Sequence, residues 1–171
     1  MDRGDIEQQL AQLHPAAFAW ALSCCRWNAS EAEEVLQSAY LQVLEGRARF
    51  AARSSFKTWL FSVVRMGAAE SRRRRWFRDA ALGRWWEGTR AVAAVPSLDE
   101  ELESRQRGAR VREALGRLAA RQREVLDLVF FHGLSIEDAA GVMGVALGTA
   151  RVHYQRGKRR LLALLALEEA E

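Results

Sequence analysis

The chain has 171 residues, and 49% of them are hydrophobic. This length allows one ordinary domain or two small ones, and this composition supports a buried core and argues against wholesale disorder. The formal net charge of +4 and the pI near 9.7 are compatible with nucleic acid as a partner, but they are too small to establish it.

The composition of the chain and its lack of a recognisable targeting or membrane segment predict a helical, cytoplasmic protein. The chain has only two prolines and no alternating run of β-branched residues, which favours an all-α fold. Asp2, Asp5 and Glu7 argue against an ordinary signal peptide. No apolar stretch approaches the roughly 20 residues that cross a bilayer. We therefore expect a soluble, cytoplasmic protein without membrane insertion.

The first predicted helix covers residues 10–26 and contains both cysteines of the chain, Cys24 and Cys25. Adjacent side chains on a helix diverge and no third cysteine exists, so we interpret both as small core side chains in a reducing cytoplasm. A second helix is predicted to begin at a capping box formed by Ser30 and Glu33, and to end near Gly46.

A third helix is predicted to begin at Phe56, after a short polar loop at residues 51–55. Apolar residues at spacings of three and four give it one buried stripe, and we assign Phe56 and Trp59 to this core side. The helix ends in the arginine run Arg72–Arg75.

The composition changes over residues 77–106, where glycines, Pro96 and an acidic cluster predict a linker. Two small helical domains, at residues 5–76 and 107–167, would flank it. Trp85 and Trp86 are unusual for a free linker, because exposed tryptophans are rare.

The second domain carries the pattern of a helix-turn-helix. Ser135 is a good N-cap for a short helix over residues 136–143, a turn at residues 144–146 follows, and a longer helix begins near Leu147. Its inward stripe includes the small residues Ala150 and Gly157. Arginine and glutamine on the opposite side suit base edges in a major groove, and lysine suits phosphate. The three histidines lie far apart and match no zinc-ligand spacing, and no cofactor is expected.

Both ends of the chain together resemble the extracytoplasmic-function sigma factors of bacterial RNA polymerase. In the first part the resemblance depends on residues 31–41, 49–50 and 54–61 and on the arginine run. In the last part it depends on residues 118–126, 133–140 and 147–151.

The resemblance implies that the first domain is sigma region 2, which binds core polymerase and recognises and melts the minus-ten element. The acidic face of the second helix would bind the coiled coil of the beta-prime subunit through Glu33, Glu34, Gln37 and Ser38. The loop and third helix would bind the minus-ten strand through Arg53, Ser54, Ser55, Lys57, Arg65, Met66, Arg72 and Arg73. Met66 stands where the family usually has asparagine, and Glu70 where it usually has aspartate.

The resemblance also implies that the second domain is sigma region 4, which recognises the minus-thirty-five element. Its contacts would come from Thr149, Arg151, Val152, Gln155, Arg156, Lys158 and Arg159. Expected partners are core polymerase (beta-prime and beta subunits), promoter DNA and a dedicated anti-sigma factor.

Three alternatives stay open at this point. A stand-alone helix-turn-helix repressor would bind its operator without polymerase. An RNA-binding adaptor would use the arginine run but would leave the helix-turn-helix unexplained. An enzyme is disfavoured because the carboxylates do not form a recognisable catalytic arrangement.

Overall fold

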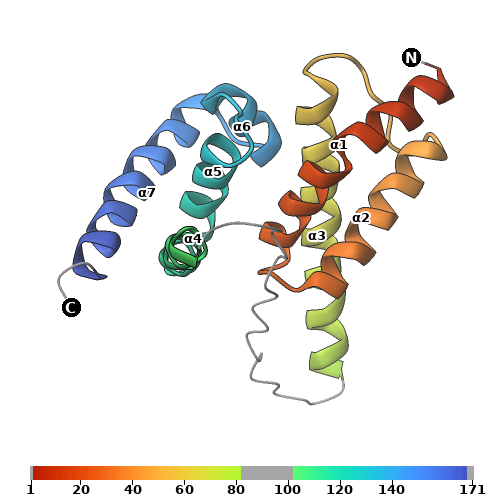
Figure 1. Ribbon diagram of the computed structural model, residues 1–171. Coiled ribbons are helices and arrows are strands. Elements are labelled where there is room, and N and C mark those ends of the chain that lie inside the picture. Colours follow the sequence, from red (N-terminus) through yellow and green to blue (C-terminus); the bar gives the residue numbers. More distant parts are fainter. Residues whose placement is uncertain (1, 82–101, 169–171) are drawn as a thin grey trace. The chain divides into compact units, whose positions relative to one another are not determined.

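The computed structural model describes residues 2–81 and 102–168, and within them all regular structure is helical (Figure 1). The helices fall into two compact units, α1–α3 and α4–α7. The predicted all-α fold with two small helical domains is therefore confirmed. Trp85 and Trp86 lie outside the described residues.

The N-terminal unit is a bundle of three helices, α1 (Arg3–Cys24), α2 (Ala29–Leu44) and α3 (Phe56–Ala81), each of which contacts the other two. Trp20 is fully buried at its centre. The indole N–H of Trp20 donates to the carbonyl of Phe61 at 3.0 Å, and the two rings stack with centroids 5.9 Å apart. This pair joins α1 to α3.

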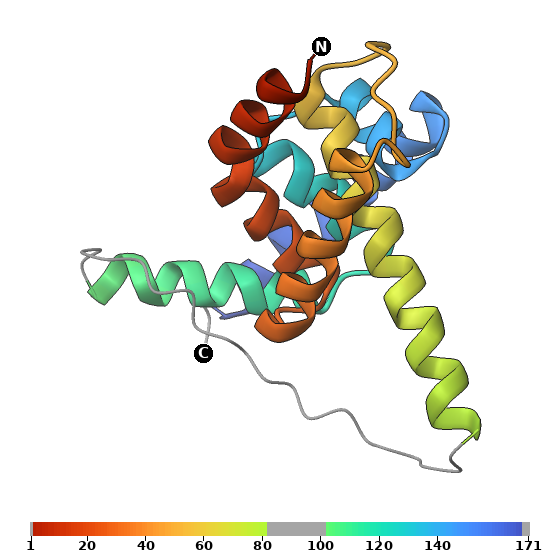
Figure 2. The same cartoon turned by 90° about the vertical axis from the view of Figure 1, so that its right-hand side faces the viewer.

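The helix α3 is longer than its contacts with the bundle require. Ala68 is its last buried residue among those whose side chains are described. Both views show the C-terminal part of α3 extending beyond α1 and α2 (Figure 1, Figure 2). The helix continues to Ala81, and α4 begins at Leu102, so helix extends into the predicted linker from both sides.

The start of α2 differs from the prediction. The capping box of Ser30 and Glu33 is wrong, because Asn28 is the N-cap and its side-chain oxygen accepts from the backbone N–H of Glu31 at 3.1 Å. The physical reason is the turn before it: Arg26 and Trp27 have left-handed backbone conformations, with φ of 54° and 66°, which bring Asn28 to the helix start. Ser30 then lies inside the first turn.

The C-terminal unit consists of α4 (Leu102–Gly116), α5 (Ala120–Phe130), α6 (Ile136–Met143) and α7 (Leu147–Glu168). The long helix α7 contacts all three others. Its core includes Leu115, Leu126 and Leu164.

The predicted helix-turn-helix of α6 and α7 is confirmed in its details. The hydroxyl oxygen of Ser135 accepts from the N–H of Asp138 at 3.0 Å and caps α6. Gly144 ends α6 with φ of 65°, a left-handed conformation that favours glycine. Ala150 and Gly157 face the other helices, as the periodicity predicted.

Candidate polymerase and nucleic-acid interfaces

The outer face of α2 is acidic and open to solvent. Glu33, Glu34, Gln37 and Ser38 are all exposed, while Val35, Leu36 and Ala39 on the opposite face are buried. Glu33 and Glu34 form no ion pair with another described residue. The structure adds Leu41, which is 54% exposed and lies one turn after Gln37. The four predicted docking residues and this apolar side chain therefore share one surface.

The loop before α3 exposes Arg53, Ser54 and Ser55. Ser55 also caps the helix: its hydroxyl oxygen accepts from the N–H of Thr58 at 3.0 Å, and its carbonyl accepts from that of Trp59 at 3.0 Å. A hydroxyl held in this way has less freedom to bind a base than the hydroxyl of an unconstrained loop serine.

An aromatic cluster holds the same loop against α3. Phe50 lies 5.4 Å from Phe56 and 5.3 Å from Trp59, measured between ring centroids. Phe56 is buried and Trp59 is half-buried, so the assignment of both rings to packing agrees with their surroundings.

Further along α3, the predicted minus-ten residues differ in exposure. Lys57 is half-buried, with its ammonium 5.7 Å from the centroid of the Phe61 ring. Arg65 is half-buried, whereas Met66 is 61% exposed. Met66, one of the two residues at which α3 departs from the pattern of the resembled family, therefore stands on the surface.

The arginine run is not a uniform cationic track, because most of it binds other parts of the unit. Arg72 donates to the carbonyl of Cys24 at 2.9 Å, Arg74 pairs with Glu70 at 2.6 Å, and Arg75 forms an ion pair with the buried carboxylate of Glu31. Arg73 is exposed and has no partner among the described residues. Sequence reasoning missed these partners, which include residues more than 40 positions away.

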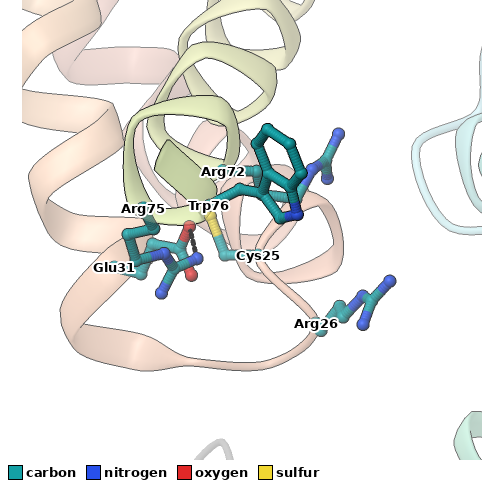
Figure 3. A pocket seen from close by; sticks show the side chains of 6 residues that line it. All are labelled: Cys25, Arg26, Glu31, Arg72, Arg75 and Trp76. Atoms are coloured by element: carbon teal, nitrogen blue, oxygen red, sulfur yellow. Dashed lines mark ion pairs between the residues drawn. The ribbon is translucent and has the colours of Figure 1, made fainter. Parts of the chain in front are cut away.

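A pocket lies where the end of α1, the start of α2 and the last turns of α3 meet. Its lining residues are Cys25, Arg26, Glu31, Arg72, Arg75 and Trp76 (Figure 3). Burial, and then the nearby Glu31 carboxylate, raise the pKa of the Cys25 thiol to about 12, against a smaller opposing effect of Arg72 and Arg75. The described residues contain no group of three side chains able to hold a metal ion.

We expect Cys25 to be nearly inert to alkylation. A pKa raised from 9.0 to about 12 lowers the thiolate fraction at pH 8 by about a thousandfold. In a Cys24→Ser chain, iodoacetamide should label Cys25 at least a hundredfold more slowly in the native protein than in 6 M guanidinium, as measured by mass spectrometry. Equal labelling rates in the native and the denatured protein would contradict the burial of this thiol. The same shift in pKa also means that the folded state loses stability as the pH rises above about 9, where the unfolded thiol ionises.

The exposed face of α7 gathers every residue predicted for duplex recognition. Ala150, Gly157 and Leu164 bury the other side of the helix. The structure also exposes Phe130 (55%) and Phe131 (58%) at the end of α5, which the periodicity did not indicate. The exposed recognition residues are Thr149, Arg151, Val152, Gln155, Arg156, Lys158 and Arg159.

Comparison with known families identifies both units. Sigma-70 region 2 matches residues 10–78, and sigma-70 region 4 matches residues 108–161. The chain is 33% identical to the ECF RNA polymerase sigma factor EcfG of Rhodopseudomonas palustris, over 99% of this chain and 87% of that protein. It is 30% identical to the sigma factor CarQ of Myxococcus xanthus, over 84% of this chain and 80% of that one.

Two solved structures are similar over nearly the whole chain. The sigma factor RpoE of Bartonella quintana, crystallised with the anti-sigma factor NepR, matches with a TM-score of 0.77 and 29% identity, covering 95% of this chain and 97% of that one. CnrH in complex with the cytosolic domain of CnrY matches with a TM-score of 0.66 and 24% identity, over 97% and 90%, and shows the shared fold. Among the described helices, none is both long and apolar enough to span a membrane.

Proposed function

Because the chain belongs to the extracytoplasmic-function sigma factors of bacterial RNA polymerase, we propose that its two units divide polymerase docking and promoter recognition between them. The observation that carries this division is the distribution of exposed side chains. The N-terminal unit presents the carboxylates of α2, and the C-terminal unit presents the basic face of α7. The domain limits that we propose are residues 5–76 and 107–167, with a linker at 77–106.

The α2 face, defined as Glu33, Glu34, Gln37, Ser38 and Leu41, would bind the beta-prime coiled coil. Unpaired carboxylates on the same helix face as an exposed leucine fit a basic, partly apolar partner helix, because charge complementarity orients the encounter while apolar burial stabilises the complex. The repressor alternative is not favoured, since it gives this face no role.

We expect Glu34→Lys to weaken association with core polymerase by about 10- to 100-fold, which corresponds to about 1.4–2.7 kcal/mol, because it places like charges against each other. The measurement is fluorescence-detected binding of the labelled full chain to core enzyme. Glu7→Lys on α1 makes the same charge reversal at another exposed position and serves as the control. Equal affinities of the two variants would remove α2 from the docking surface.

The minus-ten contacts would come from the loop and α3. Arg53, Ser54 and Ser55 lie at the helix start, and Arg65, Met66 and Arg73 follow along it. The same assignment includes Lys57 and Arg72, although Lys57 also lies near Phe61 and Arg72 also binds Cys24. Extruding a base from the stack costs a few kcal/mol, and contacts in the loop and along the strand would offset it.

The exposed face of α7 would recognise the minus-thirty-five duplex. We expect Arg151→Ala to cost about 1–3 kcal/mol on the cognate sequence and little on scrambled DNA, because a guanidinium fork distinguishes guanine. Lys158 is exposed on the same face of α7, but lysine suits a phosphate rather than a base edge. Lys158→Ala should therefore weaken binding to the cognate and the scrambled DNA equally. Electrophoretic mobility shifts at fixed salt measure both. Equal losses for Arg151→Ala on the two DNAs would make Arg151 a phosphate contact.

We further propose a non-enzymatic, cytoplasmic protein that an anti-sigma factor holds inactive. The similarity to RpoE, which was crystallised with its anti-sigma factor NepR, supports this regulation. An inhibitor that covers the α2 face would compete directly with polymerase. Addition of the purified inhibitor should abolish binding of the chain to polymerase. A variant of the α2 face that the inhibitor no longer binds should retain polymerase binding in its presence.

A further inference from the structure

The turn between α1 and α2 holds a conformation that its residues do not prefer. Arg26 and Trp27 are consecutive non-glycine residues with positive φ. Such strain persists only where surrounding contacts fix it, and it is concentrated at functional sites. Here the N–H of Trp27 donates to the carbonyl of Leu22 at 2.8 Å, and Arg72 binds the carbonyl of Cys24. The turn brings the exposed Arg26 side chain to the mouth of the pocket described above.

The pocket has an excess of positive charge at its mouth. Its one carboxylate, Glu31, is 7% exposed and is compensated by Arg75 and by the hydroxyl of Ser71 at 3.4 Å. The guanidinium of Arg26 has no partner among the described residues, and Arg72 is exposed with one N–H on Cys24. Figure 3 shows the Arg72 side chain beside the Trp76 indole, the Arg26 side chain further out and directed away from it, and the Glu31–Arg75 pair on the opposite side of the pocket.

The indole of Trp76 gives this mouth an apolar wall. Trp76 is 66% exposed, and the neighbouring Phe77 is 59% exposed with its ring centroid 5.0 Å away. Contiguous exposed apolar surface often marks a binding site, and these two adjacent rings form such a patch. An indole in a pocket that is also lined by the guanidinium groups of Arg72 and Arg26 suits a ligand that joins an anion to a flat or apolar group, such as a phosphate ester of a nucleoside.

We propose that the mouth of this pocket, lined by Arg26 and Arg72, binds a backbone phosphate of promoter DNA, with the adjoining deoxyribose packed against Trp76. The identity of the ligand rests on the proposed minus-ten role of α3, whereas the phosphate chemistry rests on the pocket alone. Trp76 lies ten residues beyond Met66 on the same helix, which is about 15 Å along its axis. A phosphate bound there would lie about four base pairs from the bases at Met66. Arg26 would thereby extend the DNA interface to α1, outside the segments assigned above.

The test measures binding of a fluorescein-labelled 20-base-pair duplex to the full chain by anisotropy, between 50 and 200 mM salt. Arg26→Gln removes one charge at the pocket, and Trp76→Leu removes the indole. Arg3→Gln removes the same charge at the far end of α1, where Arg3 is exposed. We expect Arg26→Gln to weaken binding three- to tenfold at low salt and to reduce the slope of log K against log salt by about 0.9, the value for one phosphate contact. Trp76→Leu should weaken binding with an unchanged slope, and Arg3→Gln should change neither quantity.

The second arm separates DNA from a free nucleotide. Sodium pyrophosphate and GTP are titrated into the chain, and the indole signal is assigned by comparison with Trp76→Phe. We expect displacement only at millimolar concentrations. Micromolar binding of either compound that depends on Arg26 would overturn the DNA assignment. No duplex binding by the unmodified chain, or equal slopes for Arg26→Gln and Arg3→Gln, would overturn the proposal. Binding to core polymerase is measured in parallel, so a failure of the proposed function shows as loss of that binding while the slope difference remains.

Discussion

Replacing Arg75 with alanine should destabilise the N-terminal unit by about 3 kcal/mol, because it leaves the carboxylate of Glu31 unpaired at a buried position. Glu31 is only 7% exposed, and its remaining polar contact with the Ser71 hydroxyl is long, at 3.4 Å. Arg75 itself is 39% exposed, so solvent can enter when the side chain is removed, and the loss should stay at the lower end for a buried pair. Urea unfolding followed by tryptophan fluorescence measures this unit, since residues 102–171 contain no tryptophan.

The adjacent arginine supplies the control for that experiment. Arg74 pairs with Glu70 one turn away on the same helix, and their side chains are 74% and 43% exposed. Removing such a pair costs about 0.3–0.5 kcal/mol. Arg74→Ala should therefore leave the unfolding midpoint almost unchanged, while Arg75→Ala lowers it strongly. Similar midpoints for the two variants would show that the Glu31–Arg75 pair does not stabilise the bundle.

The second large effect is expected at Gly157, where α7 packs directly against Gln122 and Leu126 of α5. A Cβ atom there would stand 3.1 Å from both the Cβ of Gln122 and a methyl of Leu126, and 3.3 Å from the Gln122 carbonyl. Because the carbonyl belongs to the helix backbone, a large side chain can fit only if the helices separate. Overpacking of this kind costs about 1–3 kcal/mol or more. Gly157→Leu should thus destabilise the C-terminal unit by at least 2 kcal/mol, as seen in thermal unfolding followed by far-ultraviolet circular dichroism.

Gly148, on the same helix, provides the matched substitution. No other atom lies within 4 Å of the Cβ position at Gly148. Leucine has a higher helix propensity than glycine by somewhat less than 1 kcal/mol, so Gly148→Leu should be neutral or slightly stabilising. A destabilisation by Gly148→Leu as large as that by Gly157→Leu would point to the exchange of glycine itself as the cause, rather than to the contact with α5.

The helix-turn-helix could be predicted from sequence almost in full, because each of its signals is local. Ser135 caps its own helix, Gly144 adopts the left-handed conformation that glycine favours, and the small residues of α7 follow the helical period. These features depend on neighbours within a few positions, so the printed sequence contains the information that sets them.

The start of α2 and the fate of the arginine run could not be predicted in this way. The left-handed turn is made by Arg26 and Trp27, residue types that give no sign of positive φ, and it moved the cap to Asn28. The ion pair of Glu31 with Arg75 joins residues 44 positions apart, and only the packing of α2 on α3 brings them together. Charged runs therefore predict where cations are, but tertiary packing decides which of them remain available to a ligand.

The exposed apolar residues show a similar limit. Leu41 lies within α2 and Phe131 directly after α5; the periodicity of these helices identifies the buried stripe, yet it does not say which apolar residues stay on the surface. In the proposed account Leu41 belongs to the α2 face, so its exposure has a functional explanation that a propensity argument could not supply.

The most direct test of the central claim is in vitro transcription on genomic fragments with purified core RNA polymerase, with and without the full chain at low salt and without inhibitor. The account predicts discrete transcripts that start at defined positions only when the chain is present, and that are strongly reduced with the Glu34→Lys variant at the same protein concentration. A chain that binds DNA but fails to associate with core enzyme and directs no specific start would contradict it.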